Sequence, residues 1–300
     1  MSLAERLPDF TDDVEDDDGP AYELRRRPAL ACPVVFSSPH SGRVYPERMM
    51  ALSRLDARAV RLSEDAYVDG LIAPAEGHGV ALMLARYGRA YVDLNREPTE
   101  LDPEMFEGGA AAAPAARTAR VAAGLGCIAR VVAQGREIYR GKLPAGEAER
   151  RIAQAWRPYH AGLDALLNEA RARFGRALLI DWHSMPGAAA RADRARTGRT
   201  PDIVLGDRFG AACAPAITAA VQRELEAAGY VVVRNTPYAG GWTTERYGRP
   251  AAGVHALQIE IRRALYLDEA RLAPSRGFDP LRRDIARLAA RLASLGREFG

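Results

Sequence analysis

Two histidines in this sequence of 300 residues stand beside apolar runs, in settings that suit metal binding or acid–base chemistry. His40 follows the apolar run of VVFSSPHSGRVYP, residues 34–46. His183 lies in ALLIDWHSMPG, where the two-residue period of a strand puts it on the same face as Asp181. Ligands in open α/β sheets gather beyond the carboxyl ends of strands, where these residues would meet. A hydrogen-bonded structural pair at a strand end is the alternative for Asp181 and His183.

Glu260 is a carboxylate that could also take part in acid–base chemistry. It lies in HALQIEIRR, residues 255–263. Polar residues alternate there with apolar ones, which predicts a strand with one polar face. An edge strand with a wet side would explain the pattern without any enzyme. An internal strand would instead hold Glu260 in a restricted environment, where burial tunes the pKa of a carboxylate for proton transfer.

Two further motifs carry charge next to predicted elements. YVDLNREP, residues 91–98, ends in Asn95 and Arg96. A guanidinium binds a carboxylate bidentately, so this pair could hold an acidic substrate, although a charged residue capping the sheet is the commoner case. LSEDAYVDG, residues 62–70, offers Glu64 and Asp65 at a predicted helix start, where the helix dipole favours acids and where a carboxylate could also complete a metal site.

Each of these residues is a weak signal alone, but together they indicate one kind of chemistry. Two histidines, a carboxylate ligand, a strand glutamate and an arginine are the parts of a metal-assisted hydrolase, which needs three protein ligands, an open water position and a general base.

The elements that must position these residues alternate along the chain. Short runs rich in β-branched residues predict strands at 32–38, 80–85, 90–95, 176–184, 202–206, 230–235 and 255–262. Apolar spacings of three and four predict helices near 48–61, 65–76, 146–173, 209–228 and 279–297. This alternation predicts an α/β fold with a mainly parallel or mixed sheet covered by helices on both faces.

Composition narrows the class of protein. The 42 Lys and Arg nearly balance 39 Asp and Glu, which disfavours nucleic acid and membrane as partners. The expected partner is the small acidic molecule that the Asn95–Arg96 pair could hold. The acidic segment 1–20 is expected to be poorly ordered, and 21–300 to form a single catalytic domain, with the alanine-rich run 108–116 as an insertion. Without a visible secretory signal we expect a cytoplasmic protein, whose oligomeric state the composition leaves unknown.

The three cysteines lack metal-binding spacing and are expected to be small buried hydrophobes. They are Cys32, Cys127 and Cys213.

Six motifs, in the same order, closely resemble those of the N-formylglutamate amidohydrolase family from about Pro33 to Asp268. They are SSPHSGRVYP, SEDAYVD, YVDLNREPTELDPEMF, DWHSMPG, TPYAGGWTTERYGRP and ALQIEIRRALY. The resemblance implies hydrolysis of N-formyl-L-glutamate to formate and L-glutamate, the end of one route of histidine degradation. The family is in turn similar to zinc carboxypeptidases and aspartoacylases, which implies a three-layer sandwich with a mixed central sheet.

Residue by residue, the resemblance implies His40 and His183 as metal ligands, Glu260 as the base, and Asn95 with Arg96 as the grip on a substrate carboxylate. The carboxypeptidase pattern places a glutamate three residues after the first histidine, but this chain has Arg43 there. We therefore expect Asp65 as the third ligand, Glu64 as its alternative, and Asp181 as the group that orients His183.

Further substrate contacts are expected from Arg262 and Arg246, and Tyr238 is a candidate donor to the oxyanion. TPYAGGWTTERYG, residues 236–248, has the glycines and aromatics of a mobile active-site loop, or equally of a plain turn. One Zn²⁺ is expected, because two imidazoles and a carboxylate with an open position suit zinc.

The remaining histidines are expected to be structural, with His160 packing inward from an amphipathic helix. They are His78, His160 and His255.

Two alternative functions remain open at this point. One keeps the machinery but changes the substrate to another N-acyl acidic amino acid, of the N-acyl-aspartate or succinyl-glutamate type. The other is a non-catalytic protein that binds small acids without metal.

Overall fold

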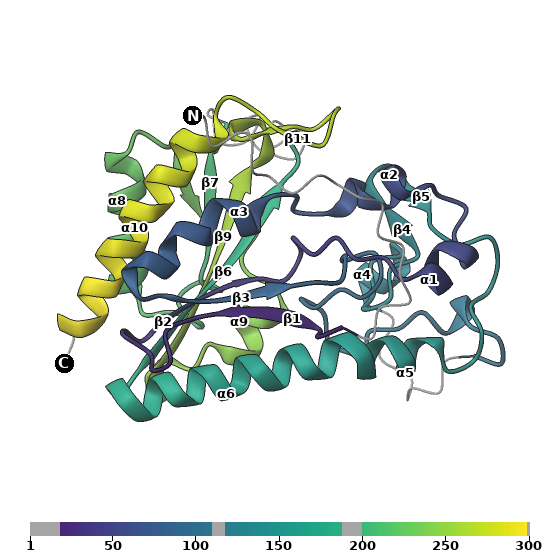
Figure 1. Cartoon of the computed structure of the whole chain (residues 1–300), viewed down its shortest axis with the longest axis horizontal. Helices are drawn as coiled ribbons and strands as arrows, with labels where there is room; N and C mark the ends of the chain where they lie inside the picture. The colour runs from purple at the N-terminus through teal and green to yellow at the C-terminus, as the bar shows by residue number, and fades with distance from the viewer. Residues whose placement is uncertain (1–18, 110–117, 188–199, 299–300) are drawn as a thin grey trace.

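A seven-stranded mixed sheet forms the centre of the molecule (Figure 1). The computed structural model describes residues 19–109, 118–187 and 200–298. The strand order is β1-β3-β2-β6-β9-β7-β8. The bounds are β1 Tyr22–Arg25, β2 Val34–Ser38, β3 Ala81–Ala85, β6 Ala177–Met185, β7 Ile203–Gly206, β8 Val232–Arg234 and β9 Val254–Arg262.

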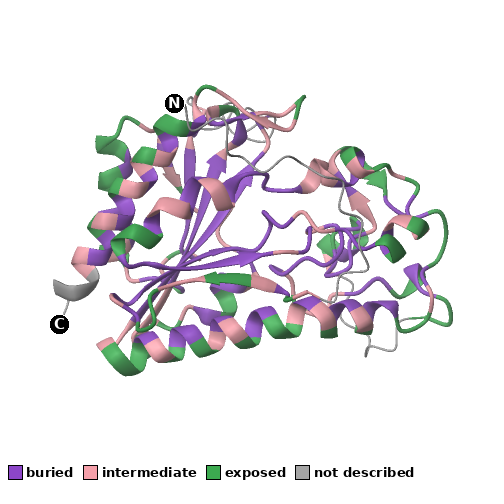
Figure 2. Cartoon of the chain, in the orientation of Figure 1, coloured by how far each residue is buried: buried purple, intermediate pink, exposed green. Residues whose placement is uncertain are grey.

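The four strands β3, β2, β6 and β9 run parallel, whereas β1 pairs antiparallel with β3 and β7 antiparallel with β9. The β9 strand is therefore internal, and the edge-strand interpretation of its polar face does not hold. Strand β6 is buried along its whole length (Figure 2).

Helices cover both faces of the sheet, which gives three layers. On one face α6 packs against β6 and β2, and α9 against β9 and β6. On the other face α3, α8 and α10 pack together and against the sheet, with α10 on the opposite side from α6 in Figure 1. The bounds are α3 Val68–Ile72, α6 Arg157–Phe174, α8 Pro215–Ala227, α9 Trp242–Tyr247 and α10 Phe278–Glu298. The predicted three-layer α/β sandwich with a mixed central sheet is confirmed.

A smaller group of short elements lies beside one end of the sheet (Figure 1). It contains α1 Glu47–Leu52, α2 Ala57–Val60, α4 Ala119–Ala122, α5 Glu147–Arg151, β4 Val131–Val132 and β5 Arg136–Glu137. A last small sheet pairs β10 Leu267–Asp268 with β11 Ala273–Pro274.

The alternation of side chains along the strands creates two apolar cores, one for each face. Leu178, Ile180 and Trp182 of β6 join the core under α3, α8 and α10. Ala177 and Leu179 join the core under α6. Because strand side chains alternate, Asp181 and His183 follow on the α6 face, toward the carboxyl end of the strand.

One strand prediction is wrong: residues 90–95 form turns and extended loop rather than a strand. The backbone there finds hydrogen-bond partners outside the sheet, such as the Cys127 carbonyl, which accepts from the Asp93 N–H at 2.7 Å. The predicted helix 48–61 is likewise interrupted, because Ser53 hydrogen-bonds the Ile138 carbonyl and Asp56 caps α2.

Several other expectations fall on particular residues. The ring of His160 is 4% exposed, which confirms inward packing, and all three cysteines are buried. Most of the acidic segment and of the alanine-rich run lies outside the described residues, so their disorder, and the division into segment 1–20 and one catalytic domain, stay predictions. Within the described residues, no helix combines the length and apolar content that crossing a membrane requires.

Candidate metal centre

A cavity of about 720 Å³ opens where the carboxyl ends of β2, β6 and β9 meet the small group of short elements. The register aligns the polar positions of neighbouring strands, with His183 opposite Glu260 and Asp181 opposite Gln258. Polar residues that line the cavity are His40, Ser63, Asp65, Arg89, Asp93, Asn95, Arg96, Arg120, Gln134, His183, Ser184, Tyr238, Gln258, Glu260 and Arg263.

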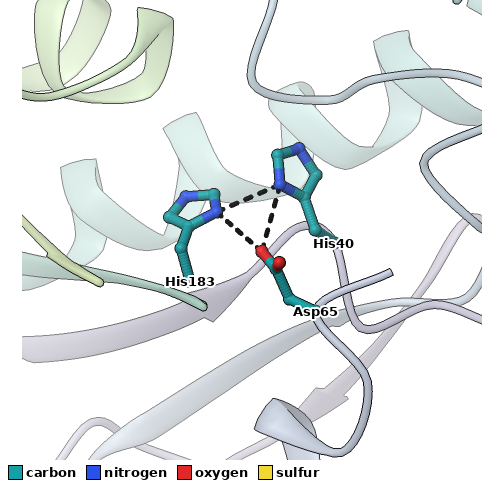
Figure 3. A group of neighbouring side chains, drawn as sticks. All are labelled: His40, Asp65 and His183. Carbon is teal, nitrogen blue, oxygen red and sulfur yellow. Dashed lines mark hydrogen bonds and ion pairs between the residues drawn. The ribbon is translucent and has the colours of Figure 1, made fainter. Parts of the chain in front are cut away.

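Three predicted ligands converge at the floor of this cavity (Figure 3). The Nδ1 atoms of His40 and His183 are 3.0 Å apart, and Asp65 Oδ2 lies 3.3 Å and 3.1 Å from them, respectively. Ligand atoms of a tetrahedral zinc, each about 2.0–2.2 Å from the ion, are separated by about 3.3 Å. The spacing of the three atoms therefore fits a zinc ion held between them.

The other nitrogen of each imidazole is held by a carboxylate. His40 Nε2 lies 2.7 Å from Asp93 Oδ1, and His183 Nε2 lies 2.8 Å from Asp181 Oδ2. A carboxylate accepts, so each ring carries its proton on Nε2 and turns the lone pair of Nδ1 toward Asp65. Two lone pairs and a carboxylate oxygen facing one another favour a bound cation, and carboxylate-oriented histidines are the usual arrangement around zinc.

The charges around the three ligands favour positive charge at this point, whether a proton or a metal ion carries it. Burial opposes the charged form of His183, but Asp181, Asp65 and Glu260 outweigh it and hold its pKa well above the ordinary value. Burial also opposes ionisation of Asp65, yet the two adjacent histidines and the charge of Arg263 keep its pKa well below the ordinary range. The pocket is therefore built for a carboxylate anion beside positive charge.

The second oxygen of Asp65 is occupied by protein groups. Ser184 Oγ and Arg263 Nη2 each lie 3.1 Å from Asp65 Oδ1, and Arg263 Nε donates to Ser184 at 3.0 Å. This leaves Oδ2 as the oxygen directed at the histidines. Asp65 is thus the third member of the cluster, whereas its alternative Glu64 turns away to Tyr45 and Arg61.

Glu260 lies beside this cluster, next to His183 in the strand register. Burial raises its pKa to about 7 and the charge of Asp65 adds to the rise, while His183, Arg89 and Arg263 act against it. Its Oε1 accepts a hydrogen bond from Gln258 at 2.8 Å. A carboxylate with a pKa near neutrality can both take and return a proton, which suits a general base.

Asn95 is clamped at the cavity wall. Its Oδ1 accepts from the Thr243 N–H at 2.8 Å, and its amide lies 3.3 Å from His183 Nε2. A Cβ at Gly241 would fall 2.3 Å from this amide, so glycine is required there.

Arg96 lies next along the chain and donates to two backbone carbonyls, those of Leu125 and Asn95. It forms no ion pair within the part of the chain that the structure describes. Burial lowers its pKa; Asp93 opposes this, while Arg120 and Arg89 lower it further. The Arg96 guanidinium is thus a cation without an ion-pair partner among the described residues, and such a group is suited to binding a carboxylate.

Two other predicted arginines do not reach the cavity. Arg262 pairs with Asp202, and Arg246 lies 3.5 Å from Asp164 on α6; neither lines the cavity. The expectation that they contact substrate is therefore corrected. Strand β9 ends at Arg262, and the turn that follows directs the next residue, Arg263, back to Asp65.

The cavity includes cations that the sequence reasoning missed, namely Arg89, Arg120 and Arg263. Arg89 Nη2 lies 2.8 Å from Asp93 Oδ2 and is spaced four residues from it, a signal visible in RAYVD. The sequence does not single out Asp93 either, because the alternation over 90–95 predicts a strand.

The 236–248 segment contributes Tyr238 and the backbone from Pro237 to Gly241 to the cavity wall. Its second half forms α9 instead of a continuous loop. Burial raises the pKa of Tyr238, and Glu260 adds to the rise, so its hydroxyl stays protonated and able to donate.

An α/β sheet that carries a His–Asp–His cluster, a neighbouring buried glutamate and a cation-lined cavity has the site of a hydrolytic enzyme that could hold a metal ion. The sequence profile of the N-formylglutamate amidohydrolase family matches residues 32–267, and the chain belongs to this family.

Known relatives agree with this assignment. The chain is 34% identical to an N-formylglutamate deformylase of Pseudomonas aeruginosa over 240 residues, which cover 79% of this chain and 83% of the relative. It is 31% identical to an N-formylglutamate deformylase of Pseudomonas putida, with coverage of 79% and 82%. The crystal structure of N-formylglutamate amidohydrolase from Ralstonia eutropha JMP134 superposes with a TM-score of 0.88, at 37% identity, covering 93% of this chain and 99% of that one.

Proposed function

We propose that this protein hydrolyses N-formyl-L-glutamate to formate and L-glutamate in a metal-dependent reaction, as the last step of a route of histidine degradation. The observation that supports this most directly is the convergence of His40, Asp65 and His183 beside the buried Glu260. Membership of the family and the deformylase activity of its relatives indicate the substrate. The proposal keeps the cytoplasmic location and the small acidic substrate expected from the sequence.

We assign the metal to the three converging atoms, His40 Nδ1, His183 Nδ1 and Asp65 Oδ2. Two imidazoles and one carboxylate with an open fourth position are the donor set of catalytic zinc, so zinc is the ion we propose. Zinc held there would supply Lewis-acid polarisation of the formyl oxygen and would lower the pKa of a water molecule beside it.

Glu260 is the proposed base. Its carboxylate takes a proton from the attacking water, whose oxygen forms the new bond to the formyl carbon. The carbon–nitrogen bond then breaks, and Glu260 returns the proton to the leaving nitrogen, so formate and glutamate are released. The rise of its pKa to about 7 supports both steps.

The substrate carboxylates are assigned to the arginine side of the cavity. Arg96, with Asn95 beside it, and Arg120 carry positive charge without an ion pair among the described residues. Tyr238 is the proposed donor to negative charge that develops on the formyl oxygen, a contribution of about 3–4 kcal/mol for one well-placed donor.

The proposal is tested by metal analysis and by formate release from N-formyl-L-glutamate for wild type, His183→Ala and His78→Ala. Wild type and the exposed His78→Ala control should contain about one metal ion per chain and release formate, because His78 is outside the cavity. His183→Ala should lose both. Equal formate release by His183→Ala would contradict the proposal.

The two alternative functions give different results in the same assay. Faster hydrolysis of N-acetyl-glutamate than of N-formyl-glutamate would indicate another acyl specificity. Binding of the substrate without metal and without formate release would indicate a non-catalytic binding protein.

A further inference from the structure

The segment from Gly88 to Arg96 supplies four of the polar residues that line the cavity: Arg89, Asp93, Asn95 and Arg96. Its residues form neither helix nor strand. Buried backbone carbonyls in such a segment need partners from elsewhere in the molecule. Whatever holds these carbonyls therefore fixes one side of the cavity.

Three of the carbonyls accept hydrogen bonds from side chains of one helical run. Arg151 Nη1 donates to the Tyr91 carbonyl at 3.2 Å. Trp156 Nε1 donates to the Arg96 carbonyl at 2.9 Å, and His160 Nε2 lies 2.8 Å from the Leu94 carbonyl. The three donors come from α5, from the turn that follows it and from α6.

A π-helical turn, Ile152–Trp156, joins α5 to α6. The Arg157 N–H donates to the Ile152 carbonyl, five residues back. Pro158 follows directly, and a proline inside a helix lacks the N–H of the regular ladder and collides with the carbonyl four residues earlier. A widened turn before the proline relieves this conflict.

The π turn also changes which side chains share a face. In a regular α-helix, Arg151 and Trp156 would lie about 140° apart around the axis, because five residues make about 1.4 turns. A turn closed over five residues brings such positions nearer to the same face. Both donors consequently reach one segment, with His160 following one turn later.

The segment is also held by α9. The Thr243 N–H donates to Asn95 Oδ1 at 2.8 Å. The neighbouring ring of Trp242 lies against those of Trp156 and His160, with centroid distances of 5.1 Å and 4.8 Å. Asn95 is thus held by α9, and Arg96 by the π-helical turn.

We propose that the π-helical turn sets the position of the Asn95–Arg96 pair, and that Trp156 is a positioning residue for substrate binding that acts through the Arg96 carbonyl. The substrate part of this inference rests on the proposed function, in which Arg96 binds a carboxylate. The positional part rests on the hydrogen bonds alone.

The test is Trp156→Phe, which keeps an aromatic ring and removes the N–H donor. Trp242→Phe is the matched control for aromatic packing, since it makes the same change in the same cluster, and among the described residues the Trp242 indole makes no hydrogen bond to the three carbonyls. In Trp156→Phe, amide hydrogen exchange of the peptide spanning 88–97 should speed up relative to wild type and to the control. KM for N-formyl-L-glutamate should rise about three- to tenfold, the effect of one lost hydrogen bond. Metal content should not change, and kcat should stay within about twofold.

Unchanged exchange in Trp156→Phe would overturn the inference, whether or not the wild type releases formate. A fall in kcat or in metal content as large as the rise in KM would also overturn it, because the residue would then act on the metal centre or on general stability. In an Arg96→Gln background, Trp156→Phe should add no further rise in KM, and an equal rise there would place its effect elsewhere. If exchange is faster in Trp156→Phe but Arg96→Gln has a normal KM, the substrate role of Arg96 in the proposed function is refuted instead.

Discussion

The chemistry of the site depends on carboxylates whose pKa values the protein shifts in opposite directions. Asp65 and Asp93 are buried, yet neighbouring histidines and arginines hold their pKa values well below the ordinary range. Glu260 lines the same cavity, and burial raises its pKa to about 7. Titratable groups with divergent pKa values mark distinct roles, here anionic support for the ligands and proton transfer.

Replacement of this glutamate gives the residue-scale prediction. Glu260→Gln should lower kcat by about 10²–10⁴-fold, because a general base is lost, while the metal content is retained. Since only the ionised base can take a proton, the wild-type kcat/KM should fall as pH decreases through the pKa of Glu260. The positive charge of a bound metal places that fall below pH 7.

Profiles of kcat/KM against pH for both proteins are the measurement. The acidic fall should be missing from the residual activity of Glu260→Gln. A variant with the full wild-type rate would remove Glu260 from the mechanism.

At the scale of elements, α6 presents His160 to two partners that suit a neutral imidazole. The Nε2 atom donates to the Leu94 carbonyl, and Nδ1 accepts from the Tyr247 hydroxyl at 2.9 Å. Burial lowers the pKa of this histidine to about 4. The ring therefore joins α6, α9 and the 88–96 segment in its uncharged form.

This arrangement predicts a pH-dependent contribution to stability. The unfolded histidine has a pKa of about 6.5, so between about pH 6.5 and 4 the unfolded chain binds a proton that the folded ring does not. The stability contributed by the neutral ring is fully present above this window and is lost as pH falls through it. A shift of this size corresponds to about 3 kcal/mol.

Urea unfolding of wild type and His160→Gln at pH 7.5 and pH 4.5 measures the effect. The variant should be less stable at pH 7.5, and the difference in unfolding free energy should shrink by about 2–3 kcal/mol at pH 4.5. A difference independent of pH would contradict a neutral buried ring. Comparison of the two proteins cancels the titration of all groups that they share.

For the whole molecule, the metal cluster joins three distant parts of the chain. His40 follows β2, Asp65 precedes α3, and His183 lies in β6. An unfolded chain does not hold the three together, so metal binding should stabilise the folded state.

Thermal unfolding before and after chelation tests this. Apo-protein should unfold at a lower temperature, and zinc at about 100 times its Kd should restore about 2.7 kcal/mol of unfolding free energy. His183→Ala should show no zinc-dependent rise. An identical unfolding temperature for apo and zinc-loaded wild type would argue against a metal bound by these three residues.

The sequence by itself determined six of the seven sheet strands, the layers that cover them and the main members of the site; β1 was missed, and the strand expected at 90–95 does not form. Hydrophobic periodicity is local, so β6 and β9 were visible with Asp181, His183 and Glu260 on their polar sides. The motifs identified His40, Asp65, Asn95 and Arg96. The strand prediction that failed also rested on a local pattern. Residues 90–95 alternate like a strand, but the hydrogen-bond partners of this segment come from a helix some sixty residues later.

Only the tertiary structure decided which charges share the cavity. Arg262 and Arg263 are neighbours in sequence, and the end of β9 sends one to Asp202 and the other to Asp65. Arg246 carries the same charge as Arg96 but faces α6. Direction of a side chain depends on where an element ends and on what packs against it, and those are long-range properties that residue type and spacing do not contain.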